Sequence, residues 1–125
     1  MNDKTRPSAS YAPMYCALYP ELAKLARDHG YPLAVHGSLQ RDMDLICVPW
    51  VALPSEPADV VVAITTRFVI RSIGEPETRE HGREVWTISI GFGGCCIDLS
   101  FMPRMPSNVR VQACAVSCAS PATGA

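Results

Sequence analysis

Apolar residues recur at helical spacing in the first part of the chain and predict a helix from Pro13 to His29. Its buried stripe is expected to consist of Tyr15, Leu18, Leu22, Leu25 and Ala26. Gly30 follows as a stop signal. Because Pro20 falls inside this span, we expect either a kink or a helix that restarts there with Pro20 in its first turn.

Short apolar runs after this helix predict two strands joined by a tight turn. The first strand is expected from Tyr31 to His36 and the second from Asp42 to Val48, where Pro49 ends it. The segment 37–41 between them, which begins with Gly37-Ser38, is the expected turn.

A second helix is expected after the loop 49–56. Ser55 is suited to its N-cap and Pro57 to its first turn, and the apolar spacing continues to about Ile73. The following segment, from Gly74 to Arg83, is charged and contains both proline and glycine. It is therefore predicted to be a solvated loop.

Strict alternation of side-chain type predicts two further strands. In the first, Trp86, Ile88 and Ile90 form one face, and the alternate positions are Val85, Thr87 and Ser89. In the second, the apolar face is Ile97, Leu99 and Phe101, and the opposite face is Cys96, Asp98 and Ser100.

Together these elements predict one α/β (α+β) domain over residues 13–104, with a small mixed sheet of about four strands and helices on one face. Residues 1–12 are expected to be flexible. Residues 105–125 are expected to form a disordered tail, because the pattern fades and the composition becomes small and polar.

Composition excludes several classes of protein. Of the 125 residues, 48% are hydrophobic and 18% charged, which is ordinary for a soluble globular domain. The formal net charge of −1 gives no electrostatic reason to expect strong nucleic-acid binding. No apolar run approaches the roughly 20 residues that span a membrane. The polar N-terminus is not typical of a signal peptide.

The six cysteines do not indicate a metal or disulfide framework. Cys16, Cys47 and Cys96 lie in apolar or periodic segments and are expected to behave as small buried hydrophobes. Cys114 and Cys118 have no partner pair at the spacing of a structural zinc site. We therefore expect a reducing, cytoplasmic setting.

Asp42 and Asp44 stand two residues apart on the second expected strand. Alternate residues of a strand point to the same face, so both carboxylates are expected on one side of the sheet. Two carboxylates at such a short distance repel each other when neither has a partner. A cation bound between them removes the repulsion. The pair therefore indicates a metal site. A turn cap paired with Arg41 is the alternative for Asp42.

A phosphate-binding turn precedes this pair. Gly37 and Ser38 offer a flexible backbone and a hydroxyl, which suit phosphate oxygens, although they also fit an ordinary turn between strands. Arg41 is either a further phosphate contact or a solvated turn residue. Asp98 supplies a third carboxylate, unless its strand face is simply solvated. A phosphate site beside three carboxylates is typical of phosphoryl transfer.

Gly37-Ser38, Asp42-Met43-Asp44 and Ile97-Asp98-Leu99 thus occur in the order helix, strand, turn, strand, helix, strand, strand. This order resembles the nucleotidyltransferase superfamily of DNA polymerase beta, and within it the small, single-domain minimal nucleotidyltransferases. The resemblance covers about residues 14–104. The segment 36–46 is also similar to small, poorly characterised proteins of phages and prophages.

The resemblance implies transfer of a nucleoside monophosphate from an NTP to an acceptor hydroxyl. It assigns Gly37 and Ser38 to the triphosphate, with Arg41 as an added contact. The three carboxylates, which are expected to hold two Mg²⁺ ions and to act in catalysis, are those of Asp42, Asp44 and Asp98. The acceptor is not identified, and a partner protein or a homodimer is expected to complete its site, because the chain is too short for a separate acceptor domain.

The chain departs from the family between the Gly-Ser turn and the first aspartate. Family members usually have a longer segment there, often a helical turn, whereas only Leu39, Gln40 and Arg41 intervene here. This departure motivates the alternative function: a catalytically inactive binding or accessory protein with the nucleotidyltransferase fold, encoded by a phage.

Overall fold

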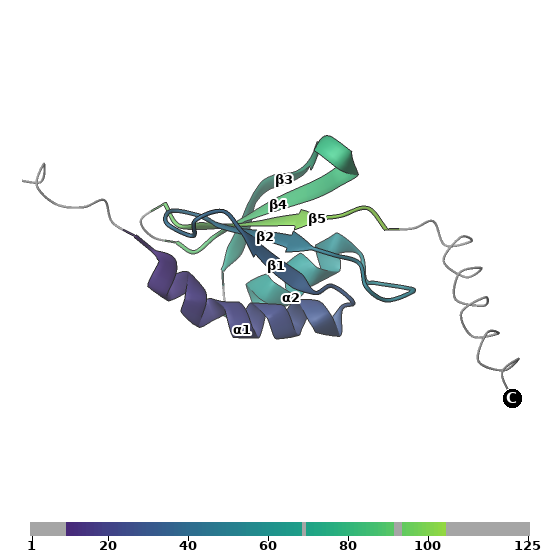
Figure 1. Cartoon of the computed structure of the whole chain (residues 1–125), viewed down its shortest axis with the longest axis horizontal. Helices are drawn as coiled ribbons and strands as arrows, with labels where there is room; N and C mark the ends of the chain where they lie inside the picture. The colour runs from purple at the N-terminus through teal and green to yellow at the C-terminus, as the bar shows by residue number, and fades with distance from the viewer. Residues whose placement is uncertain (1–9, 69, 92–93, 105–125) are drawn as a thin grey trace, which may run out of the picture.

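The structure, a computed structural model, describes residues 10–68, 70–91 and 94–104. Within these ranges it contains two helices and five strands (Figure 1). The helices are α1 (Ala12–Asp28) and α2 (Pro57–Phe68), and the strands are β1 (Leu33–His36), β2 (Met43–Cys47), β3 (Arg71–Arg79), β4 (Arg83–Ser89) and β5 (Cys96–Phe101). The expected α+β class is confirmed, but the sheet has five strands rather than about four.

The strands form one mixed sheet in the order β1-β2-β5-β4-β3. Only the central pair, β2 and β5, is parallel, and the other three pairs are antiparallel. Both helices lie on the same side of this sheet (Figure 1). The parallel pair matters for function because it places two segments far apart in sequence side by side at the middle of the sheet.

One hydrophobic core fills the space between the sheet and the two helices. The helices contribute Tyr15, Leu22, Ala26, Val60 and Ile64, and the sheet contributes alternate residues that include Met43, Leu45, Ile97, Leu99 and Phe101. These side chains are almost completely buried. The opposite face of the sheet, which no helix of the described residues covers, is called the open face below.

Helix α1 agrees closely with the prediction. It runs without a break from Ala12 to Asp28, so Pro20 lies inside it rather than ending or restarting it. The proline removes one backbone donor. Pro20 and Cys16, four residues earlier, are both exposed, so water can reach the carbonyl that loses its partner. Three cysteines were expected to be buried: Cys47 is, Cys96 is half-buried, and the expectation was wrong for Cys16.

The second half of the chain departs most from the prediction. Helix α2 ends at Phe68 instead of about Ile73, and the segment predicted as a solvated loop is largely strand β3. This strand pairs with β4 on both sides of an irregularity between Ile73 and Glu77. Proline and glycine are tolerated there because β3 is an edge strand and the irregular stretch needs no ladder hydrogen bond.

Smaller differences concern the ends of elements. Strand β1 begins at Leu33, two residues later than expected. The side chain of Ser55, expected as an N-cap, instead bonds the ring Nδ1 of His29 at 2.9 Å. None of the helices among the described residues is long and apolar enough to cross a membrane. The N-terminus was expected to be flexible over residues 1–12, but helix α1 already begins at Ala12. Residues 1–9, Cys114, Cys118 and the tail expected to be disordered from residue 105 lie outside the described residues.

Candidate functional site

Asp44 and Asp98 lie directly opposite each other at the centre of the open face. Asp44 is on β2 and Asp98 on β5, and the two are partners in the parallel register. Adjacent strands are about 4.8 Å apart, so the two carboxyl groups share one small region. Their direction is fixed because the residues flanking each of them are buried beneath the helices: Met43, Leu45, Ile97 and Leu99.

The closeness of the two carboxyl groups changes the titration of Asp44. Its pKa is raised above the ordinary aspartate value, chiefly because partial burial removes water from the charged form. The negative charge of Asp98 and a hydrogen bond with that side chain raise it further, while His36 on the neighbouring strand lowers it. In the metal-free protein the site is therefore electrostatically unfavourable, and a cation would relieve it.

This raised pKa predicts a specific pH dependence of stability. A carboxyl group whose pKa is higher in the folded chain favours folding most below its unfolded pKa, near about 3.9, and loses that contribution as the pH rises through the folded pKa. In urea titrations without metal, the wild type should therefore gain stability relative to Asp44→Asn as the pH falls from neutral through the raised pKa of Asp44. Parallel pH profiles for the two proteins would contradict this explanation.

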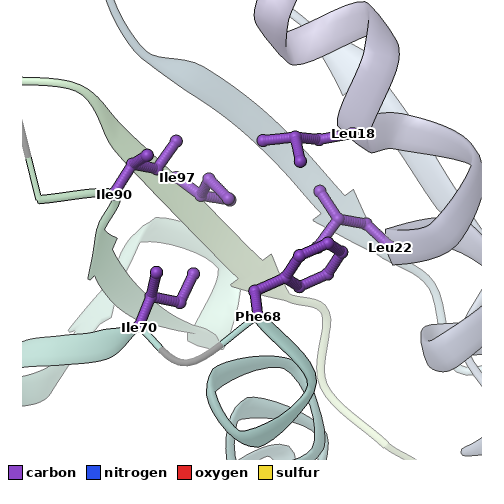
Figure 2. Close-up of a pocket in the computed structure, with 6 residues that line it drawn as sticks. All are labelled: Leu18, Leu22, Phe68, Ile70, Ile90 and Ile97. Atoms are coloured by element: carbon purple, nitrogen blue, oxygen red, sulfur yellow. The ribbon is translucent and has the colours of Figure 1, made fainter.

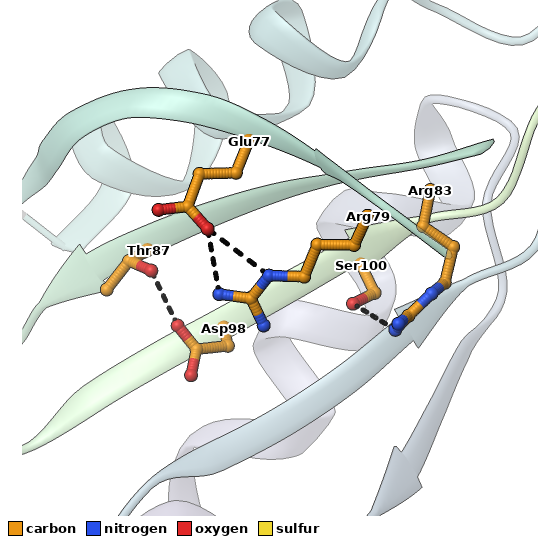
Figure 3. Close-up of polar contacts among 6 residues, drawn as sticks. All are labelled: Glu77, Arg79, Arg83, Thr87, Asp98 and Ser100. Carbon is orange, nitrogen blue, oxygen red and sulfur yellow. Dashed lines mark hydrogen bonds and ion pairs between the residues drawn. The ribbon is translucent and has the colours of Figure 1, made fainter. Parts of the chain in front are cut away.

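Thr87 on β4 holds the other carboxylate. Its hydroxyl donates a hydrogen bond of 2.6 Å to Oδ1 of Asp98, from the directly opposite position in the antiparallel register (Figure 3). This bond holds the carboxylate of Asp98 through Oδ1. The sequence analysis did not single out Thr87. The alternation of side chains along this strand could have indicated Thr87, because it places Thr87 on the face opposite Trp86 and Ile88.

Gly37 lies against the carboxylate of Asp44. Its φ is +82°, in the region that favours glycine, and a Cβ atom built on it would stand 3.1 Å from Oδ2 of Asp44. The backbone at the end of β1 therefore approaches the carboxylate as closely as a residue without a side chain allows. A phosphate held at this backbone would lie next to the carboxylate pair.

Gly37→Ala should lower both stability and the response to ligands. The positive φ alone costs about 1–2 kcal/mol for a residue with a Cβ, and the new methyl group would displace the Asp44 carboxylate. Gly91→Ala is a matched control, because Gly91 also has a positive φ (+99°) but nothing within 4 Å of its position. Chemical unfolding should show a loss for both variants, whereas only Gly37→Ala should weaken stabilisation by Mg²⁺ and NTP. Equal ligand responses would contradict the role of Gly37.

Helix α1 anchors the turn that carries Ser38 and Arg41. The backbone N–H of Tyr11 donates to the carbonyl of Gln40 at 2.8 Å, and the hydroxyl of Tyr15 donates to the carbonyl of Arg41. Burial raises the pKa of Tyr15, so its phenol stays protonated and remains a donor. Tyr15 was expected only as a core residue. The role of its hydroxyl, which holds the turn through the carbonyl of Arg41, was not predicted.

Ser38 and Arg41 are exposed within this turn. The Ser38 hydroxyl accepts a hydrogen bond of 3.2 Å from the backbone N–H of Gln40, which is a turn stabilised by its own side chain. The hydroxyl proton stays available to a ligand. Leu39 has a φ of +61°, and its side chain packs against the core. The short connection to β2 is therefore a compact, anchored turn.

Asp42 is placed less firmly than the other two carboxylates. It comes one residue before β2, so strand alternation does not set its direction, and it is exposed. It is close enough for its charge to contribute to the raised pKa of Asp44. In the part of the chain that the structure describes, no group of three or more His, Cys, Asp or Glu side chains is gathered as a ready metal site.

The donor chemistry nevertheless fits Mg²⁺. Magnesium prefers oxygen ligands, keeps several water molecules and commonly uses only one or two carboxylates together with phosphate oxygens of the substrate. Asp44 and Asp98 supply two such carboxylates on facing strands, and the repulsion between them is the kind that a divalent cation removes. Asp42 contributes only its nearby charge in this structure, since it is not gathered with the other two carboxylates into a three-ligand site.

A separate cavity of about 240 Å³ opens on the helix side of the sheet (Figure 2). Its lining is entirely apolar: Leu18, Leu22, Phe68, Ile70, Ile90 and Ile97. Ile97 points into it, whereas its neighbour Asp98 belongs to the open face. A triphosphate has no polar partner in this cavity, so it is distinct from the carboxylate site.

Comparisons with known proteins give no further assignment: no protein-family model, no curated protein and no solved structure matches the chain.

Proposed function

We propose that this protein is a metal-dependent nucleotidyltransferase, which moves a nucleoside monophosphate from an NTP to an acceptor hydroxyl. The observation that carries the proposal is the facing pair of Asp44 and Asp98 with the backbone of Gly37 against it. Two carboxylates beside an anchored Gly-Ser turn suit a metal and a phosphate at the same place. The resemblance to the nucleotidyltransferase superfamily indicates that this phosphate belongs to a nucleotide.

Each side chain then has a defined role. Asp44 and Asp42 would bind both Mg²⁺ ions, and Asp98 would bind the one nearer the acceptor. The backbone at Gly37, the Ser38 hydroxyl and Arg41 would hold the β- and γ-phosphates. Bound Mg²⁺ would supply Lewis-acid chemistry and neutralise charge on the phosphates. Thr87 keeps the Asp98 carboxylate in one orientation by donating to Oδ1.

The transfer itself is a substitution at the α-phosphorus. The acceptor hydroxyl oxygen forms a bond to this phosphorus, and the bond from it to the oxygen bridging towards the β-phosphate breaks. Pyrophosphate leaves with that electron pair. The hydroxyl proton passes to the carboxylate of Asp98, from which water removes it. Positioning and electrostatic stabilisation account for most of the rate in this type of reaction.

A thermal melt with and without Mg²⁺ and each NTP tests the proposal. At 100 times its dissociation constant, a ligand that binds only the folded state stabilises it by about 2.7 kcal/mol. For a domain of this size the melting temperature should then rise by roughly 10 °C. The rise should require metal and nucleotide together, because the phosphates complete the metal coordination.

The second candidate is a catalytically inactive accessory protein with the same fold. It is favoured by the turn at Ser38, which is short and closed by its own hydrogen bond to Gln40. This closed turn gives the triphosphate less room than a longer connection. No rise in melting temperature with any NTP would support this candidate, and a search for protein partners would follow.

A further inference from the structure

The open face continues beyond the carboxylates onto a basic region. Strands β3 and β4 carry Arg79 and Arg83, which are direct partners in the antiparallel register. Register places both on the same face as Thr87 and Asp98 (Figure 3). The open face therefore carries carboxylates on β2 and β5 and two arginines on β3 and β4, beside Glu77 of β3. Arg79 and Arg83 are called the arginine pair below.

The guanidinium of Arg83 is half-buried and only partly satisfied. Its Nε donates to the backbone carbonyl of Glu80 at 3.0 Å, and its Nη1 donates to the hydroxyl of Ser100 at 3.3 Å. The other N–H groups of this guanidinium have no acceptor among the described residues. They include both N–H groups on Nη2. None of the ion pairs between described residues includes Arg83. Arg83 is thus held in place without an ion pair to any carboxylate of residues 10–68, 70–91 and 94–104.

Arg79 is held by a contact that is easily exchanged. Its Nε and Nη2 both donate to a single oxygen of Glu77, at 3.3 and 3.0 Å, and both side chains are at least half exposed. Exposed ion pairs of this kind contribute little to stability. Like charges directly opposite on neighbouring strands are unfavourable, so a ligand that neutralises Arg79 and Arg83 together would gain from relieving them.

The arginine pair is close enough to the carboxylates to serve the same reaction. Ser100, which bonds Arg83, is two residues after Asp98 on the same face of β5. Two residues of strand span roughly 7 Å. A single small molecule can therefore contact the Asp98 carboxylate with one group and the Arg83 guanidinium with another. The planar fork of arginine can bind phosphate oxygens in a bidentate way.

We propose that the arginine pair is the acceptor site and that the acceptor itself carries a phosphate, which Arg83 and Arg79 hold while its hydroxyl points to Asp98. This inference rests on the proposed transferase function and adds the chemical class of the acceptor. A nucleoside monophosphate and the 3′ end of a short RNA share this chemistry, because each has a hydroxyl near a phosphate. Glu77 releases Arg79 when such a phosphate binds.

Nitrogen-15 NMR of the full chain tests the proposal and locates the binding. With Mg²⁺ and a non-hydrolysable NTP analogue in excess, adenosine monophosphate and a triribonucleotide are titrated in separate experiments. The Nε–H signals of Arg79 and Arg83 and the amide of Ser100 should shift. Arg83→Gln should weaken binding by about tenfold, since it removes a charge-assisted contact. Glu77→Gln should strengthen binding, and Arg27→Gln, on the exposed end of α1, should leave it unchanged.

The outcomes separate this proposal from the proposed function. Binding of the NTP analogue is read from signals of Gly37, Ser38 and Asp44, so loss of those shifts counts against the transferase alone. If neither probe binds, or if binding does not respond to Arg83→Gln and Glu77→Gln, the acceptor site is wrong. Tighter binding of the monophosphate than of the triribonucleotide would identify a small-molecule acceptor, and the reverse would identify an RNA end.

Discussion

Asp44→Asn should abolish the combined stabilisation by Mg²⁺ and NTP and reduce nucleotidyl transfer by at least about a hundredfold. The substitution removes a ligand charge at the centre of the open face while keeping nearly the same volume. Without metal, the variant should be more stable than the wild type at neutral pH, because the repulsion between Asp44 and Asp98 disappears. Thermal melts, with pyrophosphate release as the activity assay, measure both effects.

Asp44→Asn should thus raise stability without metal but remove the stabilisation by Mg²⁺ and NTP. This combination distinguishes a metal ligand from a structural residue. A residue that merely supports the fold would lower stability with and without metal. Asp28→Asn is a suitable control, because Asp28 is an exposed residue at the end of α1 that pairs with Lys24. It should leave the ligand response unchanged. If Asp44→Asn kept full activity, or lost stability in the absence of metal, the assigned role of Asp44 would be wrong.

Leu99→Ala should destabilise the protein by about 2–5 kcal/mol, a large share of the roughly 5–15 kcal/mol that holds a small domain together. Leu99 is fully buried on the central strand β5, where both helices and the neighbouring strands leave little room for collapse. Urea unfolding followed by circular dichroism gives the loss directly.

The adjacent residue provides the matched comparison. Asp98→Asn lies on the opposite face of the same strand and keeps the oxygen that accepts from Thr87. It should therefore cause no loss of unfolding free energy, and without metal it should stabilise the protein because it too removes the repulsion with Asp44. Similar losses for the two variants would mean that β5 does not separate a packed face from an open one.

The sequence predicted the strands around the carboxylates well because both alternate clearly. Leu45 and Leu99 are buried and face the helices, whereas the residue before each of them is a half-buried aspartate on the other face. What local patterns could not show is that β2 pairs with β5, since this contact joins segments about fifty residues apart. Asp44 and Asp98 lie opposite each other only because these two strands pair, so their proximity could not be predicted from local sequence patterns.

A different reason explains why strand β3 was not predicted. Segment 71–79 contains Gly74, Pro76 and several charges, which together indicate a loop. It forms a strand because β4 offers a free edge, and the irregular stretch after Ile73 accommodates the proline. The expected helix end at Ile73 failed for the same reason, since this residue pairs with Thr87. Tertiary pairing outweighed local propensity, and the basic side of the open face was hidden as a consequence.

The most direct test of the central claim is to locate the metal. Mn²⁺ replaces Mg²⁺ at oxygen-rich sites and broadens nearby NMR signals. With Mn²⁺ and a non-hydrolysable NTP analogue, the account predicts the strongest broadening at the amides of Gly37, Asp44 and Asp98, and little at Leu22 on the helix side of the sheet. Equal weak broadening along the whole chain, or broadening confined to other residues, would contradict a metal-dependent nucleotide site at Asp44 and Asp98.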